Sequence, residues 1–113
     1  ALLKCTSSYP APIEEANLIM IKDIADRFDV ITGLSDHTMG STAPIAATVI
    51  GAKIIEKHFI IDRSIGGADA SFSMNEQEFT EMVKAVRDTE KAVGVVDYHL
   101  TEKQKKGKGK IRD

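Results

Sequence analysis

Cysteine is nearly absent from this sequence: Cys5 is the single one among 113 residues, which excludes a disulfide within one chain. A chain without disulfides is typical of a reducing compartment, so we expect a cytoplasmic protein. No apolar run approaches the roughly 20 residues that span a bilayer, and the first residues do not form a basic and then apolar leader. We therefore expect neither a membrane partner nor export. Within its apolar run, Cys5 is expected to be a small buried residue rather than a nucleophile.

Charge is unevenly distributed along the chain. Residues 1–100 carry nine Lys or Arg against fifteen Asp or Glu, whereas residues 101–113 carry six against two. A basic tail is one means of binding nucleic acid. This tail has no aromatic residue to stack on a base, and its glycines suit a flexible connection. We therefore expect one domain over residues 1–100, a linker over residues 101–113, and no nucleic-acid partner.

Apolar residues follow two alternating periods, and their share of 42% excludes a disordered chain. Short strand-like runs alternate with segments of helical spacing, in the order 2–6, 13–28, 30–34, 42–50, 53–61 and 76–93. The order β-α-β-α-β-α predicts an α/β fold with a parallel sheet covered by helices. Periodicity alone is compatible with a small doubly wound sheet or with part of a (β/α)₈ barrel.

The helix ends carry recognisable signals. Asn75 followed by Glu78 predicts a capping box at the start of the last helix, and Gly94 is expected to close that helix. Pro44 is expected in the first turn of the middle helix, where a missing N–H costs nothing. Gly51 follows the end of the same helix.

Each of the three strand-like runs ends in a polar cluster. The clusters are residues 7–9 (SSY), 35–38 (SDHT) and 56–58 (EKH). In parallel α/β folds the reacting groups lie beyond the carboxyl ends of the strands. Three clusters in equivalent positions therefore predict a functional site at one edge of the sheet.

Two histidines, His37 and His58, stand at the ends of consecutive strands. Adjacent parallel strands are ~4.8 Å apart, so two imidazoles placed there could share one divalent cation. The alternatives are a backbone hydrogen bond for His37, and for His58 a pairing with Glu56 or Asp36. For the pair we favour the metal. Asp36 could orient an imidazole or cap the helix that follows.

Three further polar residues are candidates for binding. Ser35, together with amides at the start of the next helix, could contact a phosphate, although such helix starts are often empty. Tyr9 could hydrogen-bond a substrate or pack against the neighbouring prolines. Asp69, in a glycine-rich loop, could bind a sugar hydroxyl or amide, or stabilise a turn.

Four stretches of the chain resemble signature stretches of the sialic acid synthase family. They are residues 5–12 (CTSSYPAP), 33–38 (GLSDHT), 55–59 (IEKHF) and 69–74 (DASFSM). They stand in the family's order, and the likeness extends from about residue 2 to about residue 106. The first stretch and the 64–73 loop are most similar to the pseudaminic acid synthases. N-acetylneuraminate enzymes usually have Asn at the position of Ser7, and the family often has Pro at that of Ala68.

The resemblance implies a C-terminal β-α-β-α-β-α portion of a (β/α)₈ TIM barrel, followed by a linker toward an antifreeze-like domain absent from this sequence. It implies an enzyme that condenses phosphoenolpyruvate with an open-chain N-acetylated hexose, giving a nine-carbon 2-keto acid and phosphate. It also implies a divalent metal ion, Mn²⁺ or Mg²⁺, and a homodimer of the full-length enzyme. The chain opens on a residue other than Met inside a strand-like run, so we expect a fragment that is inactive by itself.

The resemblance also implies residue roles. His37 and His58 would bind the metal ion, while Ser7 and Ser35 would contact the phosphate of phosphoenolpyruvate. The candidate catalytic residues, which would position the sugar or the water, are Tyr9, Glu56 and Asp69; Tyr9 and Asp69 would also bind substrate.

Two other functions remain open at this point. One is a different metal-dependent TIM-barrel enzyme, such as an aldolase or a sugar-phosphate isomerase. The other is a nucleic-acid-binding module that uses the basic tail.

Overall fold

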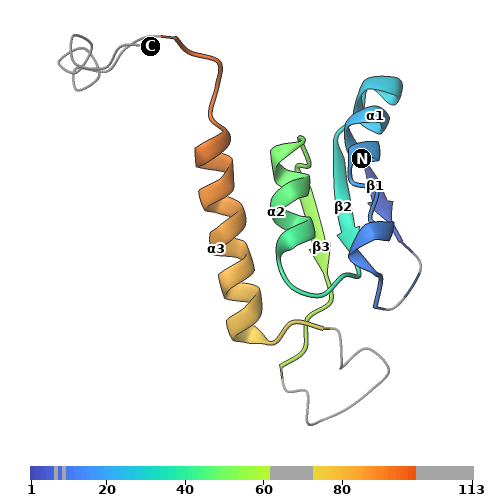
Figure 1. Cartoon of the computed structure of the whole chain (residues 1–113), viewed down its shortest axis with the longest axis vertical. Coiled ribbons are helices and arrows are strands. Elements are labelled where there is room, and N and C mark those ends of the chain that lie inside the picture. Colours follow the sequence, from blue (N-terminus) through green and yellow to red (C-terminus); the bar gives the residue numbers. More distant parts are fainter. Residues whose placement is uncertain (7, 9, 62–72, 99–113) are drawn as a thin grey trace, which may run out of the picture.

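The sheet at the centre of the molecule is parallel, as the sequence predicts. The computed structural model describes residues 1–6, 8, 10–61 and 73–98. Its elements are β1 (Leu2–Cys5), the 3₁₀ helix η1 (Ile13–Glu15), α1 (Ile19–Phe28), β2 (Thr32–Asp36), α2 (Thr42–Val49), β3 (Ile54–Lys57) and α3 (Glu76–Val93). The strands form one sheet in the order β1-β2-β3, so all three carboxyl ends lie at one edge (Figure 1). The α/β class is thereby confirmed.

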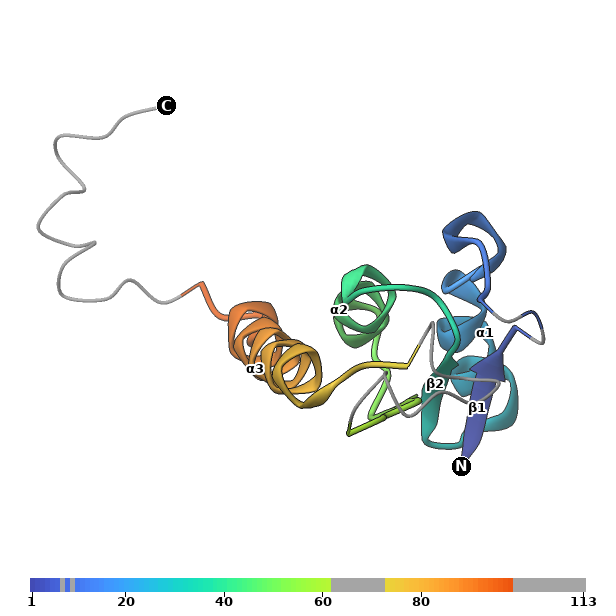
Figure 2. The same ribbon diagram turned by 90° about the horizontal axis from the view of Figure 1, so that it is seen from below.

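Helices α1 and α2 cover the same face of the sheet, and α3 lies beside α2 (Figure 2). The core between sheet and helices is small; it consists of Ile21, Leu34, Ala43, Ala47 and Ala52. Because the α2 residues in this core are alanines, the helix can lie close to β2. Within the described part of the chain, no helix covers the opposite face.

Side chains alternate between these two faces of the sheet. Leu34 points into the helix-covered core, so its neighbour Ser35 points to the open face. The register pairs Ser35 with Cys5 on one side and with Glu56 on the other. One residue further along, Asp36 pairs with Lys57 and shares the helix face with Leu34.

The first predicted helix is interrupted. Instead of one helix over residues 13–28, the chain forms η1 and then α1, which starts at Ile19. Asn17 lies between them in the left-handed region, with φ 45°. Asn tolerates this conformation better than most residues, and a residue in it cannot continue a right-handed helix.

Two strand limits also differ from the prediction. The second strand runs from Thr32 to Asp36 rather than over 30–34, because its pairing with β1 begins at Thr32 opposite Leu2. The third strand ends at Lys57 rather than at residue 61. Beyond it, Phe59 forms only an isolated bridge with Met74.

The helix-end signals are largely confirmed. Asn75 and Glu78 form the capping box: the Glu78 N–H donates to Asn75 Oδ1 over 2.9 Å, and the Asn75 N–H donates to Glu78 Oε1 over 3.1 Å. Gly94 follows α3 with φ 58°. Pro44 is buried in the first turn of α2. None of the helices in the described ranges is both long and apolar enough for a membrane span.

Candidate functional site

His37 and His58 lie side by side at the carboxyl ends of β2 and β3. Their ring centroids are 5.3 Å apart, with the ring planes inclined by 48°. His37 is buried, with 7% of its surface exposed, and His58 is half-buried. The structure therefore brings the two imidazoles together, as predicted.

The residue that follows β1 fixes the His37 ring. His37 Nδ1 lies 2.6 Å from the backbone carbonyl oxygen of Thr6. A carbonyl only accepts hydrogen bonds, so Nδ1 carries the proton and the lone pair of the neutral ring is on Nε2. A backbone carbonyl on one ring nitrogen is a common way of orienting a histidine that binds a metal through the other.

Cys5 lies close to the same ring nitrogen. Its Sγ is 3.8 Å from His37 Nδ1, but the thiol is exposed, so the expectation of a buried cysteine is wrong. The reason is the strand alternation, which places Cys5 on the open face of the sheet beside Ser35.

Ser35 and Glu56 form a second contact between β2 and β3 on the open face. The Ser35 hydroxyl donates to Glu56 Oε1 over 2.6 Å. A pocket of about 340 Å³ adjoins both residues; it is lined by Ser35, Asp36, His37, Glu56, Lys57 and His58. Because the hydroxyl hydrogen of Ser35 points to Glu56, a bond from Ser35 to a phosphate would require that hydroxyl to turn.

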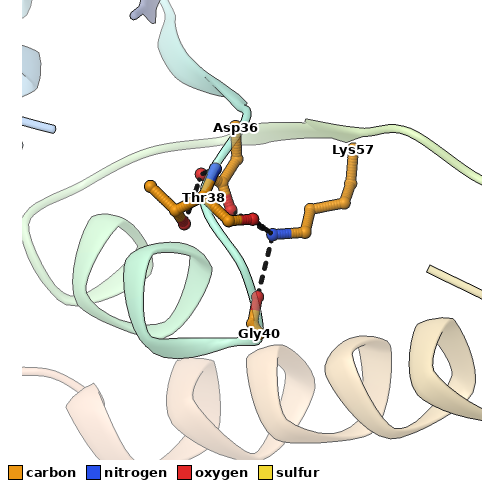
Figure 3. Close-up of polar contacts among 4 residues, drawn as sticks. All are labelled: Asp36, Thr38, Gly40 and Lys57. Carbon is orange, nitrogen blue, oxygen red and sulfur yellow. Dashed lines mark hydrogen bonds and ion pairs between the residues drawn. The ribbon is translucent and has the colours of Figure 1, made fainter. Parts of the chain in front are cut away.

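Asp36 does not orient a histidine. Its Oδ2 lies 2.6 Å from Lys57 Nζ, in an ion pair whose two side chains are each 1% exposed (Figure 3). Its Oδ1 accepts from the backbone N–H and the hydroxyl of Thr38, over 2.9 and 2.7 Å. The interpretation of Asp36 as a partner of an imidazole is thus wrong, and so is its pairing with His58. Asp36 lies on the helix face, on the other side of β2 from the His37 ring.

Lys57 and Thr6 are contributors that the sequence reasoning missed. In the sequence Lys57 is one member of a polar cluster, and in the structure it is the buried partner of Asp36. Its position one residue before His58 in an alternating strand is the signal that could have placed it on the helix face. Thr6 acts through its backbone carbonyl, which no sequence pattern reveals.

Three predicted site residues, Ser7, Tyr9 and Asp69, lie outside the described residues, as does the basic segment 101–113. Four others, Ser35, His37, Glu56 and His58, are brought together at one edge of the sheet. Within the described ranges, no group of three His, Cys, Asp or Glu side chains is arranged to hold a metal ion. The structure therefore brings together two candidate ligands, the imidazoles of His37 and His58.

Comparison with known proteins points to one family. The NeuB family model matches residues 1–98. The chain is 47% identical to the pseudaminic acid synthase of Campylobacter jejuni over 94% of its own length and 31% of that protein. It is 48% identical to the pseudaminic acid synthase of Helicobacter pylori, over 82% of this chain and 27% of that one. It thus spans less than a third of the length of these curated relatives.

A solved structure shows the same arrangement of elements. The N-acetylneuraminic acid synthetase of Leptospira borgpetersenii superposes with a TM-score of 0.82 at 30% identity, over 94% of this chain and 37% of that one. The family match covers the whole sheet, its helices and the site at the strand ends. The chain therefore belongs to the NeuB family.

Proposed function

We propose that the protein containing this chain condenses phosphoenolpyruvate with an open-chain N-acetylated hexose, giving a nine-carbon 2-keto acid and phosphate. One observation carries the proposal: in a chain of the NeuB family, Ser35, His37, Glu56 and His58 meet at one edge of the sheet. The similar proteins named above are synthases of pseudaminic and N-acetylneuraminic acids. The full-length enzyme is expected to be a cytoplasmic homodimer.

We also propose that the three strands are the C-terminal part of a (β/α)₈ barrel. In the described part of the chain β1 and β3 are both sheet edges, and one face of the sheet has no helix over it. A barrel would pair both edges and enclose the open face. The chain's coverage of less than a third of its relatives is compatible with this. Residues 101–113 would then be a linker to a further domain.

His37 and His58 are proposed to hold a divalent ion, Mn²⁺ or Mg²⁺. The hydrogen bond from His37 Nδ1 to Thr6 supports this, since it leaves the lone pair on the other ring nitrogen. When bound, such an ion polarises the sugar aldehyde as a Lewis acid. The alternative function, another metal-dependent barrel enzyme, would also use His37 and His58 as metal ligands but would not consume phosphoenolpyruvate.

The reaction assigns distinct tasks to the other residues. Carbon 3 of phosphoenolpyruvate forms a bond to the aldehyde carbon while the carbonyl π bond breaks toward oxygen, which takes up a proton and becomes a hydroxyl; a cation is left at carbon 2. Water adds to carbon 2 and loses a proton, and the resulting hydroxyl becomes the ketone as phosphate leaves and takes the second proton. Glu56 is suited to accept the proton, because its carboxylate is on the open face and is held there by the Ser35 hydroxyl. Ser7 and Ser35 are proposed to contact the phosphate, and Tyr9 and Asp69 the sugar.

The sugar is proposed to be a 2,4-diacetamido-trideoxy hexose, the precursor of pseudaminic acid. The identities of 47% and 48% to two pseudaminic acid synthases support this choice. A much higher kcat/KM for N-acetylmannosamine in the full-length enzyme would contradict it.

The function is tested by supplying the full-length enzyme with phosphoenolpyruvate and a panel of N-acetylated hexoses and measuring released phosphate. We expect release that depends on the sugar, disappears on chelation and returns with Mn²⁺. The isolated chain 1–113 is expected to release none. Turnover of a sugar phosphate without phosphoenolpyruvate would favour the aldolase or isomerase. Filter binding of nucleic acid that is lost without residues 101–113 would favour the binding module.

A further inference from the structure

We propose that the buried pair Asp36–Lys57 is a positioning device that sets the spacing of His37 and His58. The inference rests on the proposed metal site, because it explains how the chain holds the two imidazoles at a fixed separation. Asp36 directly precedes one histidine and Lys57 the other. The pair therefore links the two strand ends immediately behind the imidazoles, on the opposite face of the sheet.

The ammonium group of Lys57 makes three bonds, all to the segment that carries His37. Nζ donates to Asp36 Oδ2 over 2.6 Å, to the Thr38 carbonyl over 2.6 Å and to the Gly40 carbonyl over 2.8 Å (Figure 3). These acceptors lie on both sides of His37 in the sequence. A shift of His37 relative to the end of β3 would therefore lengthen several charge-assisted bonds at once.

Asp36 also holds the backbone of residues 36–38 in one conformation. Its Oδ1 accepts from both the N–H and the hydroxyl of Thr38, which closes the chain into a tight turn around His37. In the described part of the chain, every buried side-chain nitrogen or oxygen has a hydrogen-bond partner. The network is thus fully satisfied, the condition under which a buried polar group specifies one geometry.

Stability alone does not account for a buried ion pair. The cost of removing two charges from water can exceed their attraction, and apolar residues of similar size often replace such pairs without loss. An apolar pair, however, would provide no bond from β3 to Thr38 or Gly40. If the pair positions the two histidines, replacing it with uncharged residues should weaken metal binding while the protein stays folded.

The test uses the full-length enzyme and the double variant Asp36→Asn, Lys57→Met. The new amide keeps the acceptor for Thr38, and no unpaired charge is left buried. Mn²⁺ affinity is measured from the electron paramagnetic resonance signal of the free ion, and stability from thermal unfolding. We expect a folded variant that binds Mn²⁺ about 10-fold or more weakly, as found when groups behind metal ligands are changed.

The matched control is the exposed pair Lys22–Asp26 on α1, joined over 2.9 Å with 63% and 67% of the two side chains exposed. The hydrogen bond from Lys22 to Asp26 and the negative charge of Asp26 raise the pKa of Lys22. Like Asp36–Lys57, the control is therefore a formed ion pair. The double variant Lys22→Met, Asp26→Asn is expected to leave Mn²⁺ affinity unchanged.

Each outcome decides the proposal. A folded Asp36→Asn, Lys57→Met variant with wild-type affinity would overturn the positioning role, provided that His37→Ala abolishes binding. If His37→Ala leaves Mn²⁺ affinity unchanged, the metal site itself is wrong and the inference falls with it. If the double variant does not fold, Asp36→Asn alone decides. It keeps two Lys57 bonds, so a smaller loss of affinity supports the role and an unchanged affinity refutes it.

Discussion

Replacing Gly33 with alanine is expected to force β2 and β3 apart. A Cβ atom at Gly33 would stand 2.3 Å from the carbonyl oxygen of Ile54, 2.7 Å from Leu3 Cδ2 and 2.8 Å from Ile54 Cβ. Ordinary contacts of a Cβ begin near 3.4 Å. Leu3 can rotate away, but the Ile54 atoms belong to the strand paired with β2. Overpacking typically costs about 1–3 kcal/mol, and because backbone must move we expect the upper end of that range.

The measurement is the thermal unfolding midpoint of the full-length enzyme. A loss of about 3 kcal/mol corresponds to a fall of roughly 6–12 °C for a domain of barrel size. The control is Gly40→Ala: no atom lies within 4 Å of its Cβ, but its φ is +76°, a backbone conformation that costs alanine roughly 1–2 kcal/mol. A midpoint for Gly33→Ala equal to or above that of Gly40→Ala would refute the steric argument.

Three further predictions concern single side chains. His37→Ala and His58→Ala are each expected to weaken Mn²⁺ binding strongly while His99→Ala does not, which a titration of the full-length enzyme checks; equal effects would contradict the shared site. Cys5→Ser should change Mn²⁺ affinity less than about 2-fold, because the thiol is 3.8 Å from Nδ1 while the Thr6 carbonyl holds that nitrogen at 2.6 Å; loss of all activity would instead indicate a nucleophile. Asn75→Ala removes a capping box and should cost about 1 kcal/mol in thermal unfolding; an unchanged midpoint would show that the cap is dispensable.

The element order could be predicted because the local signals agree with the packing. Short apolar runs mark the approximate places of the strands, and alanines at 43 and 47 mark the face of α2 that lies on the sheet. Asn75 and Glu78 mark the start of α3 and Gly94 its end. Each of these signals is local, so the sequence alone contains it.

The limits of the strands depend on partners that are distant in the sequence. Val30 and Ile31 have the composition of a strand, yet they precede the first residue paired with β1 and are exposed, by 36% and 60%. Apolar residues after Lys57 likewise continue the third strand by composition, but β2 ends at Asp36, its partner. The pairing register between strands decides where β2 begins and β3 ends, and no local sequence pattern specifies that register.

Grouping polar residues by their position in the sequence predicts only the open-face half of the site. It places Asp36 with His37 and Lys57 with His58. In a strand, successive side chains point to opposite faces, so each pair of neighbours is divided between the two sides of the sheet. The second members, His37 and His58, meet as imidazoles beside the pocket, and the first members, Asp36 and Lys57, meet as a buried ion pair on the helix-covered face. Short motifs such as Asp36-His37 and Lys57-His58 therefore contain both the candidate ligands and the contact that holds them in register, and it is the alternation, more than residue type, that separates the two tasks.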